Sequence, residues 1–139
     1  MALFRWDEIN RATLTTVLPD ALVVLPVGAT EQHGPHLPTG TDALLVTAVT
    51  GAAAQRAAPR APRDVVLAPT LPFGASDHHF PFGGTLSLSQ ETMTAAMVEL
   101  AGSVGRDGGH RMVIVNGHGG NKGACFSAAA AASTRHGMA

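Results

Sequence analysis

The sequence predicts an α/β fold built around a mostly parallel sheet. Three apolar runs rich in valine, isoleucine and leucine lack the polar–apolar alternation of half-exposed strands, as expected for strands buried on both faces. A glycine-rich turn and then a helical stretch follow each run, and strands that alternate with helices form right-handed crossovers in a parallel sheet. The predicted strands span residues 21–28, 64–71 and 111–117.

A helix is predicted after each strand, which gives about three βα units, and a short helix is predicted before the first strand. Thr41 or Asp42, Ser89 and Asn121 are plausible N-caps of the three longer helices. The predicted helices span 6–17, 41–58, 89–108 and 121–136.

The end of the sequence leaves the predicted sheet open. Gly137 is typical of a residue that ends a helix, and the sequence stops two residues later. Three parallel strands alone would leave an apolar sheet edge uncovered. We therefore expect residues 1–139 to form a single domain that is truncated at its C-terminus, or one whose edge is completed by a partner.

Composition argues against several classes of protein. The chain has 139 residues, 45% of them hydrophobic, and a net charge of −1 without a basic stripe, so nucleic-acid binding is not expected. No uninterrupted apolar run reaches the roughly 18 residues of a membrane span, and the first residues lack the apolar region of a secretory signal. The single Cys125 is expected to be a small buried side chain, and the expected location is cytoplasmic.

Ionisable side chains gather in the loops that follow the predicted strands, where open α/β sheets bind their ligands. Glu31 and His33 are two residues apart, so in extended chain they point the same way. Asp42 follows at the start of a helix, and His118 is the one large ionisable side chain of the glycine-rich NGHGGN turn.

Two imidazoles and two carboxylates are the ligand chemistry of zinc, manganese or iron. Such a set can also hold two metals about 3.5–4 Å apart that share a hydroxide. Four such side chains would be costly to bury unpaired. The sequence therefore predicts a metal site formed by Glu31, His33, Asp42 and His118.

Other interpretations of these segments stay open. Asp42 alone is more often a helix cap, and His36, which follows a proline, can simply hydrogen-bond a backbone carbonyl. The segment NGHGGNKG also suggests a nucleotide-binding turn, but Lys122 occupies the third glycine position of G-x-G-x-x-G and no Walker Gly-Lys-Ser/Thr occurs. A nucleotide-binding module is therefore the weaker hypothesis.

Three segments, PVGATEQHGPHLPTGTD, GASDHHFPFGGTLSLS and VNGHGGN, resemble the signature segments of the creatininase family, in order and from about Leu3 to the last residue. The resemblance implies a three-layer α/β/α sandwich and a binuclear metal site, usually zinc, with manganese or iron in some members. It also implies hydrolysis of C–N bonds in cyclic or formyl amides, and assembly into homo-oligomers, commonly hexamers.

The resemblance also implies roles for individual residues. Glu31 and His118 would bind one metal, His33 would bind the second, and Asp42 would bridge both. His79 matches the histidine of the family's E-H-x-x-F-P-G-T segment and would line the substrate pocket, for which His36 is a further candidate.

Three features depart from the family pattern. Gly120 stands where creatininase itself has a glutamate, which argues against creatinine as the substrate. A downstream H-A-G-x-x-E-T-S segment that supplies an acid in many relatives is absent, so the chain corresponds to about the first three-fifths of the family domain, which has the size of a single domain. His78 stands where relatives usually carry an acid.

The expected function is that of a metal-dependent amidohydrolase. A metal-bound hydroxide would attack the carbonyl of a small-molecule amide, and a general acid, not identifiable in this chain, would protonate the leaving nitrogen. The alternative is a non-catalytic fragment or remnant of the same fold that binds metal weakly or not at all.

Overall fold

The structure, a computed structural model, describes residues 1–139 and contains one sheet of four strands, all parallel. The register places Val24 opposite Leu67 on one side and Val113 on the other. The parallel α/β fold that the sequence predicts is thereby confirmed. The strands are β1 (Leu3–Arg5), β2 (Leu22–Val27), β3 (Val65–Leu67) and β4 (Met112–Asn116), in the spatial order β1-β3-β2-β4.

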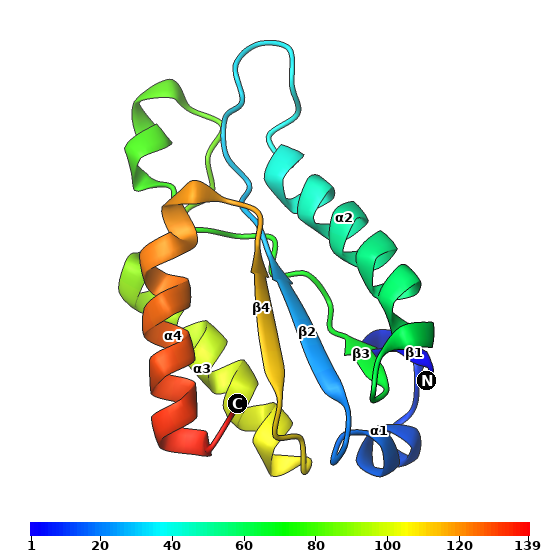
Figure 1. The fold of residues 1–139 in the computed structure, drawn as a ribbon. Helices are drawn as coiled ribbons and strands as arrows, with labels where there is room; N and C mark the ends of the chain where they lie inside the picture. Colours follow the sequence, from blue (N-terminus) through cyan, green and yellow to red (C-terminus); the bar gives the residue numbers. More distant parts are fainter.

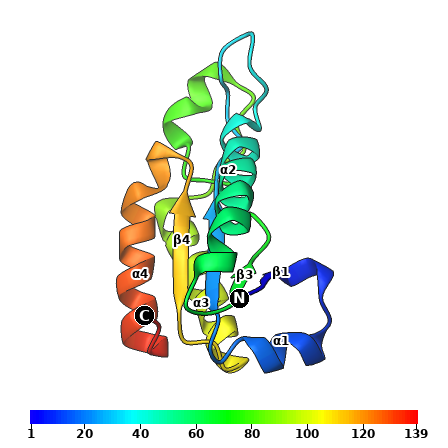
Figure 2. The same ribbon diagram turned by 45° about the vertical axis from the view of Figure 1, so that its right-hand side comes forward.

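Helices cover both faces of this sheet and give the three-layer α/β/α arrangement (Figures 1 and 2). One face is covered by α2 (Thr41–Ala57), while α3 (Gln90–Arg106) and α4 (Lys122–His136) lie side by side on the other. None of these helices is both long and apolar enough to span a membrane. The helices are α1 (Arg11–Val17), α2 (Thr41–Ala57), α3 (Gln90–Arg106) and α4 (Lys122–His136), with short 3-10 turns η1 (Trp6–Glu8), η2 (Ala58–Arg60), η3 (Asp77–Phe82) and η4 (Gly119–Asn121).

Alternate side chains of strand β2 face opposite sides of the sheet and contribute to the core on each side. Val23, Leu25 and Val27 are buried against the layer that contains α3 and α4. Val24 points to the opposite face, where it packs against a small cluster that includes Ala54 of α2. The strand is thus enclosed on both faces, which explains why its sequence shows an unbroken apolar run.

One predicted strand is much shorter than expected, and one strand of the sheet was not predicted. Strand β3 ends at Leu67 rather than at residue 71, because Pro69 has no N–H to donate to the ladder, and pairing resumes only in an isolated bridge between Leu71 and Val27. Strand β1 was not predicted, since three residues are too few to show a periodicity. It extends the sheet beside β3.

The fourth strand of the sheet is β1, which forms one edge, and strand β4 forms the other. Along it, the Ala139 N–H donates to the His110 carbonyl and the Met112 N–H donates to the Ala139 carbonyl, both at 2.9 Å. No other strand pairs with this side of β4.

The predicted helix caps are only partly confirmed. Ser89 caps α3, because its hydroxyl accepts a hydrogen bond from the Thr92 N–H at 3.1 Å. Helix α2 is preceded by Gly40 and has no side-chain cap, so neither Thr41 nor Asp42 has this role. Asn121 precedes α4, but its side chain does not cap the helix.

Gly28, just beyond β2, permits the first turn of α2 to lie against the strand end. A Cβ atom at position 28 would lie 2.6 Å from the Cα atom and 2.8 Å from the nitrogen of Ala43. Both are backbone atoms, so the helix itself would have to move. The start of α2 carries Asp42, and this contact therefore positions a candidate site residue.

We expect Gly28→Ala to lower the free energy of unfolding by about 1–3 kcal/mol, the usual cost of overpacking. Urea unfolding monitored by circular dichroism measures the change. Gly119→Ala is the matched control, because a Cβ atom there meets no neighbour within 4 Å, and its effect should stay within about 0.5 kcal/mol. Equal stability of the two variants would contradict the role given to Gly28.

Candidate metal centre

Three loops meet at the carboxyl end of the sheet (Figure 1). They follow β2 (28–40), β3 (68–89) and β4 (117–118). The loop after β2 returns on itself, since the Glu31 N–H donates to the Thr39 carbonyl at 2.8 Å. The fold thereby brings together side chains that are up to 87 positions apart in the sequence, between Glu31 and His118.

The carboxylate of Glu31 lies at the centre of this end of the sheet and is almost completely buried, with 5% of its side chain exposed. Its Oε1 atom is 3.5 Å from Nε2 of His79, and its Oε2 atom is 3.4 Å from Nε2 of His118. No donor makes a hydrogen bond to Oε2. A buried carboxylate oxygen without a donor is costly unless a positive charge is nearby.

Asp42 lies between two histidines. Its Oδ2 atom accepts a hydrogen bond from Nδ1 of His118 at 2.9 Å, and its Oδ1 atom is 3.2 Å from Nε2 of His33. The Asp42 side chain is 16% exposed and that of His33 is 20% exposed. The structure thus brings together the four residues that the sequence singled out, and their role as ligands stays a prediction.

Both ring nitrogens of His33 face oxygen acceptors. Nδ1 donates to the Glu31 backbone carbonyl at 3.2 Å, and Nε2 faces Asp42. The backbone hydrogen bond raises the pKa of His33 above its ordinary value of 6.5; burial opposes this rise, and the charges of Asp42 and Glu31 add to it. The doubly protonated ring is therefore more favourable for His33 than for an ordinary histidine.

Asn121 holds the three loops together and was missed as a site residue. It is completely buried. Its Nδ2 group donates to the Gly28 carbonyl and its Oδ1 atom accepts from the Ala75 N–H, both at 2.9 Å. Asn121 ends the segment NGHGGN, but a polar residue before a helix is equally typical of an N-cap, which is the role that the sequence suggests.

Three further histidines were named from the sequence, and they differ in position. His79 lies beside the site, where its Nδ1 accepts from the Gln32 side-chain amide at 2.7 Å and its Nε2 faces Glu31. His78 lies next to it on η3. His36 is exposed on the loop after β2 and its ring makes no hydrogen bond, so its place in a substrate pocket stays a prediction.

The donor set fits a divalent cation. Two groups of three side chains each offer ligand atoms that all lie within 4.8 Å of one another: Glu31, His33 and Asp42, and Glu31, His78 and His118. Imidazole nitrogens and carboxylate oxygens are the usual ligands of zinc and manganese. The buried, unpartnered oxygen of Glu31 supports the same conclusion.

A family model described as creatinine amidohydrolase matches residues 3–139. The chain belongs to the creatininase family. Among curated relatives, the mycofactocin precursor peptide peptidase of Mycobacterium tuberculosis is 43% identical over 123 residues, which are 84% of this chain and 48% of the relative. The creatinine amidohydrolase of Pseudomonas putida is 36% identical over 106 residues, or 71% of this chain and 38% of the relative.

Solved creatininase structures share the fold. Creatininase Mn superposes with a TM-score of 0.83 at 28% identity, covering 97% of this chain and 54% of that chain. A mutant creatininase of the Zn-Zn type has a TM-score of 0.82 at 29% identity, covering 94% and 51%. The chain thus spans about half the length of the relatives that it matches or less.

Replacing Asn121 tests whether its side chain positions the loops, because the loss of its buried hydrogen bonds should lower stability. We expect Asn121→Ala to lower the free energy of unfolding by about 1–3 kcal/mol for each backbone group left unpaired, at Gly28 and Ala75. Asn121→Asp should also destabilise, because it loses the donor to the Gly28 carbonyl. Gln55→Ala, on the exposed surface of α2, is the control, and urea unfolding is the measurement. A loss no larger than that of Gln55→Ala would contradict this role.

The raised pKa of His33 predicts a pH-dependent contribution to stability. A raised folded-state pKa contributes stability that is fully present below the unfolded-state pKa and is lost as the pH rises through the folded-state pKa. In chelator, the stability advantage of the wild-type chain over His33→Ala should therefore be larger at about pH 6 than at about pH 8. Denaturant unfolding at both pH values tests this, with the exposed His110→Ala variant as the reference for general pH effects. An advantage that increases with pH would contradict it.

Proposed function

We propose that this chain forms the metal-binding part of a metal-dependent amidohydrolase, an enzyme that hydrolyses an amide C–N bond. The observation that carries the proposal is the buried carboxylate of Glu31, which has an unpartnered oxygen and lies among imidazoles. The relatives support the same class of reaction, because they are named as a peptidase and a creatinine amidohydrolase.

In this proposal Glu31 and His118 hold one divalent cation, His33 holds the second, and Asp42 lies between them. Zinc is the first candidate and manganese the second, since the similar structures include a Zn-Zn type and creatininase Mn. When bound, such cations lower the pKa of a water molecule to about 7 and polarise an amide carbonyl.

The chain's own residues orient this site. Asp42 accepts a hydrogen bond from Nδ1 of His118 and so fixes the plane of that ring. The Glu31 carbonyl does the same for His33 through its Nδ1. His79, held by Gln32, turns its Nε2 toward the carboxylate of Glu31, which places it to contact an amide substrate.

The substrate is proposed to be a small or peptide amide other than creatinine. A side chain at position 120 would collide with the Ala75 carbonyl oxygen and with Nε2 of His118, so the glutamate that creatininase carries there has no room. The sequence identity to the peptidase, 43%, is also higher than that to the creatinine amidohydrolase, 36%.

We further expect the protein to be cytoplasmic and to form a homo-oligomer. Size-exclusion chromatography with light scattering would measure the number of chains in the assembly.

We expect the purified protein to retain about two divalent cations per chain after dialysis, the number that a paired site holds. A chelator should remove them and abolish hydrolysis of cyclic, formyl and peptide amides, and added zinc or manganese should restore it. Glu31→Gln should weaken cation binding by at least about 10-fold, as loss of even an outer-shell partner does. Elemental analysis and isothermal titration calorimetry give the two readouts.

His110→Ala is the control, because His110 is exposed at the opposite end of β4. Hydrolysis that continues in chelator would contradict the metal-dependent mechanism. A chain that retains no cations and cleaves no amide of the panel would instead support the alternative, a non-catalytic fragment or remnant of the same fold that binds metal weakly or not at all.

A further inference from the structure

We propose that His78 is a further ligand of the cation held by Glu31 and His118. Together with Asp42, which lies between the two cations, the set would then contain two imidazoles and two carboxylates. This inference rests on the proposed function, because it concerns the same metal centre. It adds a ligand from a third loop, which the four-residue set does not include.

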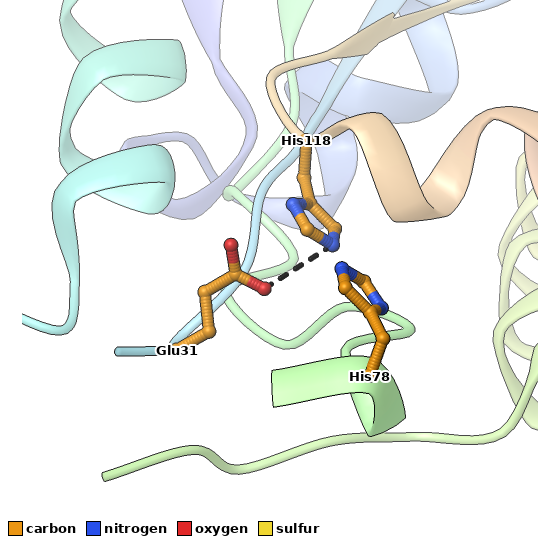
Figure 3. A group of neighbouring side chains, drawn as sticks. All are labelled: Glu31, His78 and His118. Atoms are coloured by element: carbon orange, nitrogen blue, oxygen red, sulfur yellow. Dashed lines mark ion pairs between the residues drawn. The ribbon is translucent and has the colours of Figure 1, made fainter. Parts of the chain in front are cut away.

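Figure 3 shows how the three side chains converge. Glu31 comes from the loop after β2, His118 from the end of β4 and His78 from η3. Each offers one ligand atom, and these atoms all lie within 4.8 Å of one another. The imidazole rings of His78 and His118 are nearly parallel, with centroids 6.0 Å apart and an interplanar angle of 4°.

The oxygen atoms around His118 favour a cation at its Nε2 atom. Nδ1 already donates to Asp42, so Nε2 is the nitrogen left for a metal. Around it lie Oε2 of Glu31 at 3.4 Å, and the Ser76 hydroxyl and the Ala75 carbonyl at 3.2 Å each. The unpartnered Oε2 of Glu31 points to the same place, and a divalent cation would satisfy it.

His78 is held near this point by its turn. The His79 N–H donates to the Ser76 carbonyl at 2.8 Å, which closes the first turn of η3. The Ser76 N–H in turn donates to the Ser87 hydroxyl at 2.7 Å, which ties the start of the turn to the far end of the same loop. His78 is exposed whereas Glu31 and His118 are buried, so it lies on the solvent side of the site.

Imidazole nitrogens and carboxylate oxygens are usual protein ligands of zinc, and catalytic zinc sites keep one position open for water or substrate. Because His78 lies on the solvent side, a cation held by Glu31, His78 and His118 would be reachable from solvent. A packing contact between two histidine rings is the competing explanation for the parallel arrangement. If His78 only packs against His118, a flat ring without a ligand atom should preserve metal binding. If His78 is a ligand, a different side chain that can bind metal should preserve it.

Cobalt(II) titration of two His78 variants distinguishes metal binding by His78 from ring packing. His78→Phe keeps a flat ring against His118 but has no ligand atom, whereas His78→Glu removes the ring and supplies a carboxylate. We expect His78→Phe to weaken one of the two cation sites by at least about 10-fold, and His78→Glu to restore it to near the wild-type affinity. The cobalt absorption spectrum should change in His78→Phe and not in His110→Phe, the control.

A second measurement uses the wild-type chain alone. Histidine-ring ¹H–¹⁵N spectra recorded during zinc titration should show a His78 ring nitrogen shifting together with that of His118. Wild-type affinity for two cations in His78→Phe, equal losses in both His78 variants, or an unshifted His78 ring would each overturn the inference while leaving the proposed function in place. A wild-type chain that binds no cobalt or zinc would contradict both.

Discussion

The burial of one carboxylate, that of Glu31, is the constraint on which the functional end of this protein depends. A carboxylate removed from water is unfavourable unless positive charge or several donors surround it. Here His79 and His118 approach its two oxygens at 3.5 and 3.4 Å, yet Oε2 receives no hydrogen bond. The fold tolerates a buried oxygen atom without a hydrogen bond at the point where a bound cation would compensate for it. Such unfavourable groups are common at functional sites, where function and stability conflict.

The rest of the fold keeps that carboxylate in place. A parallel sheet directs the carboxyl ends of β2, β3 and β4 to the same side, and glycines at the strand ends bring the backbone close to α2. Asn121 then joins two of the loops to a third through its single buried amide group. The site is therefore positioned mainly by backbone hydrogen bonds and close backbone contacts rather than by its ionisable side chains alone.

The sequence predicted the parts of this structure that depend on long patterns. The apolar run at 21–28 contains β2, and the helix predicted at 41–58 matches α2 to within one residue. Strand β1 was missed because Leu3–Arg5 is too short to show a period. The convergence of Glu31 and His118 could be predicted, because each follows a strand of the parallel sheet. The role of Asn121 could not be predicted, because a sequence does not show whether a short polar side chain hydrogen-bonds its own helix or a distant loop.

The three loops differ in how freely they can change. Asp42 lies in the first turn of α2 and His118 two residues after the end of β4, so both lie close to elements of the core. His78 lies on an exposed 3-10 turn whose other side chains include Phe80 and Phe82, 55% and 71% exposed. Substitutions of these two phenylalanines would change the surface beside the site without removing any proposed ligand, because both side chains are exposed. Exposed positions of the loop after β3 are thus where this fold can change what contacts its substrate while His78 and the buried ligands stay in place.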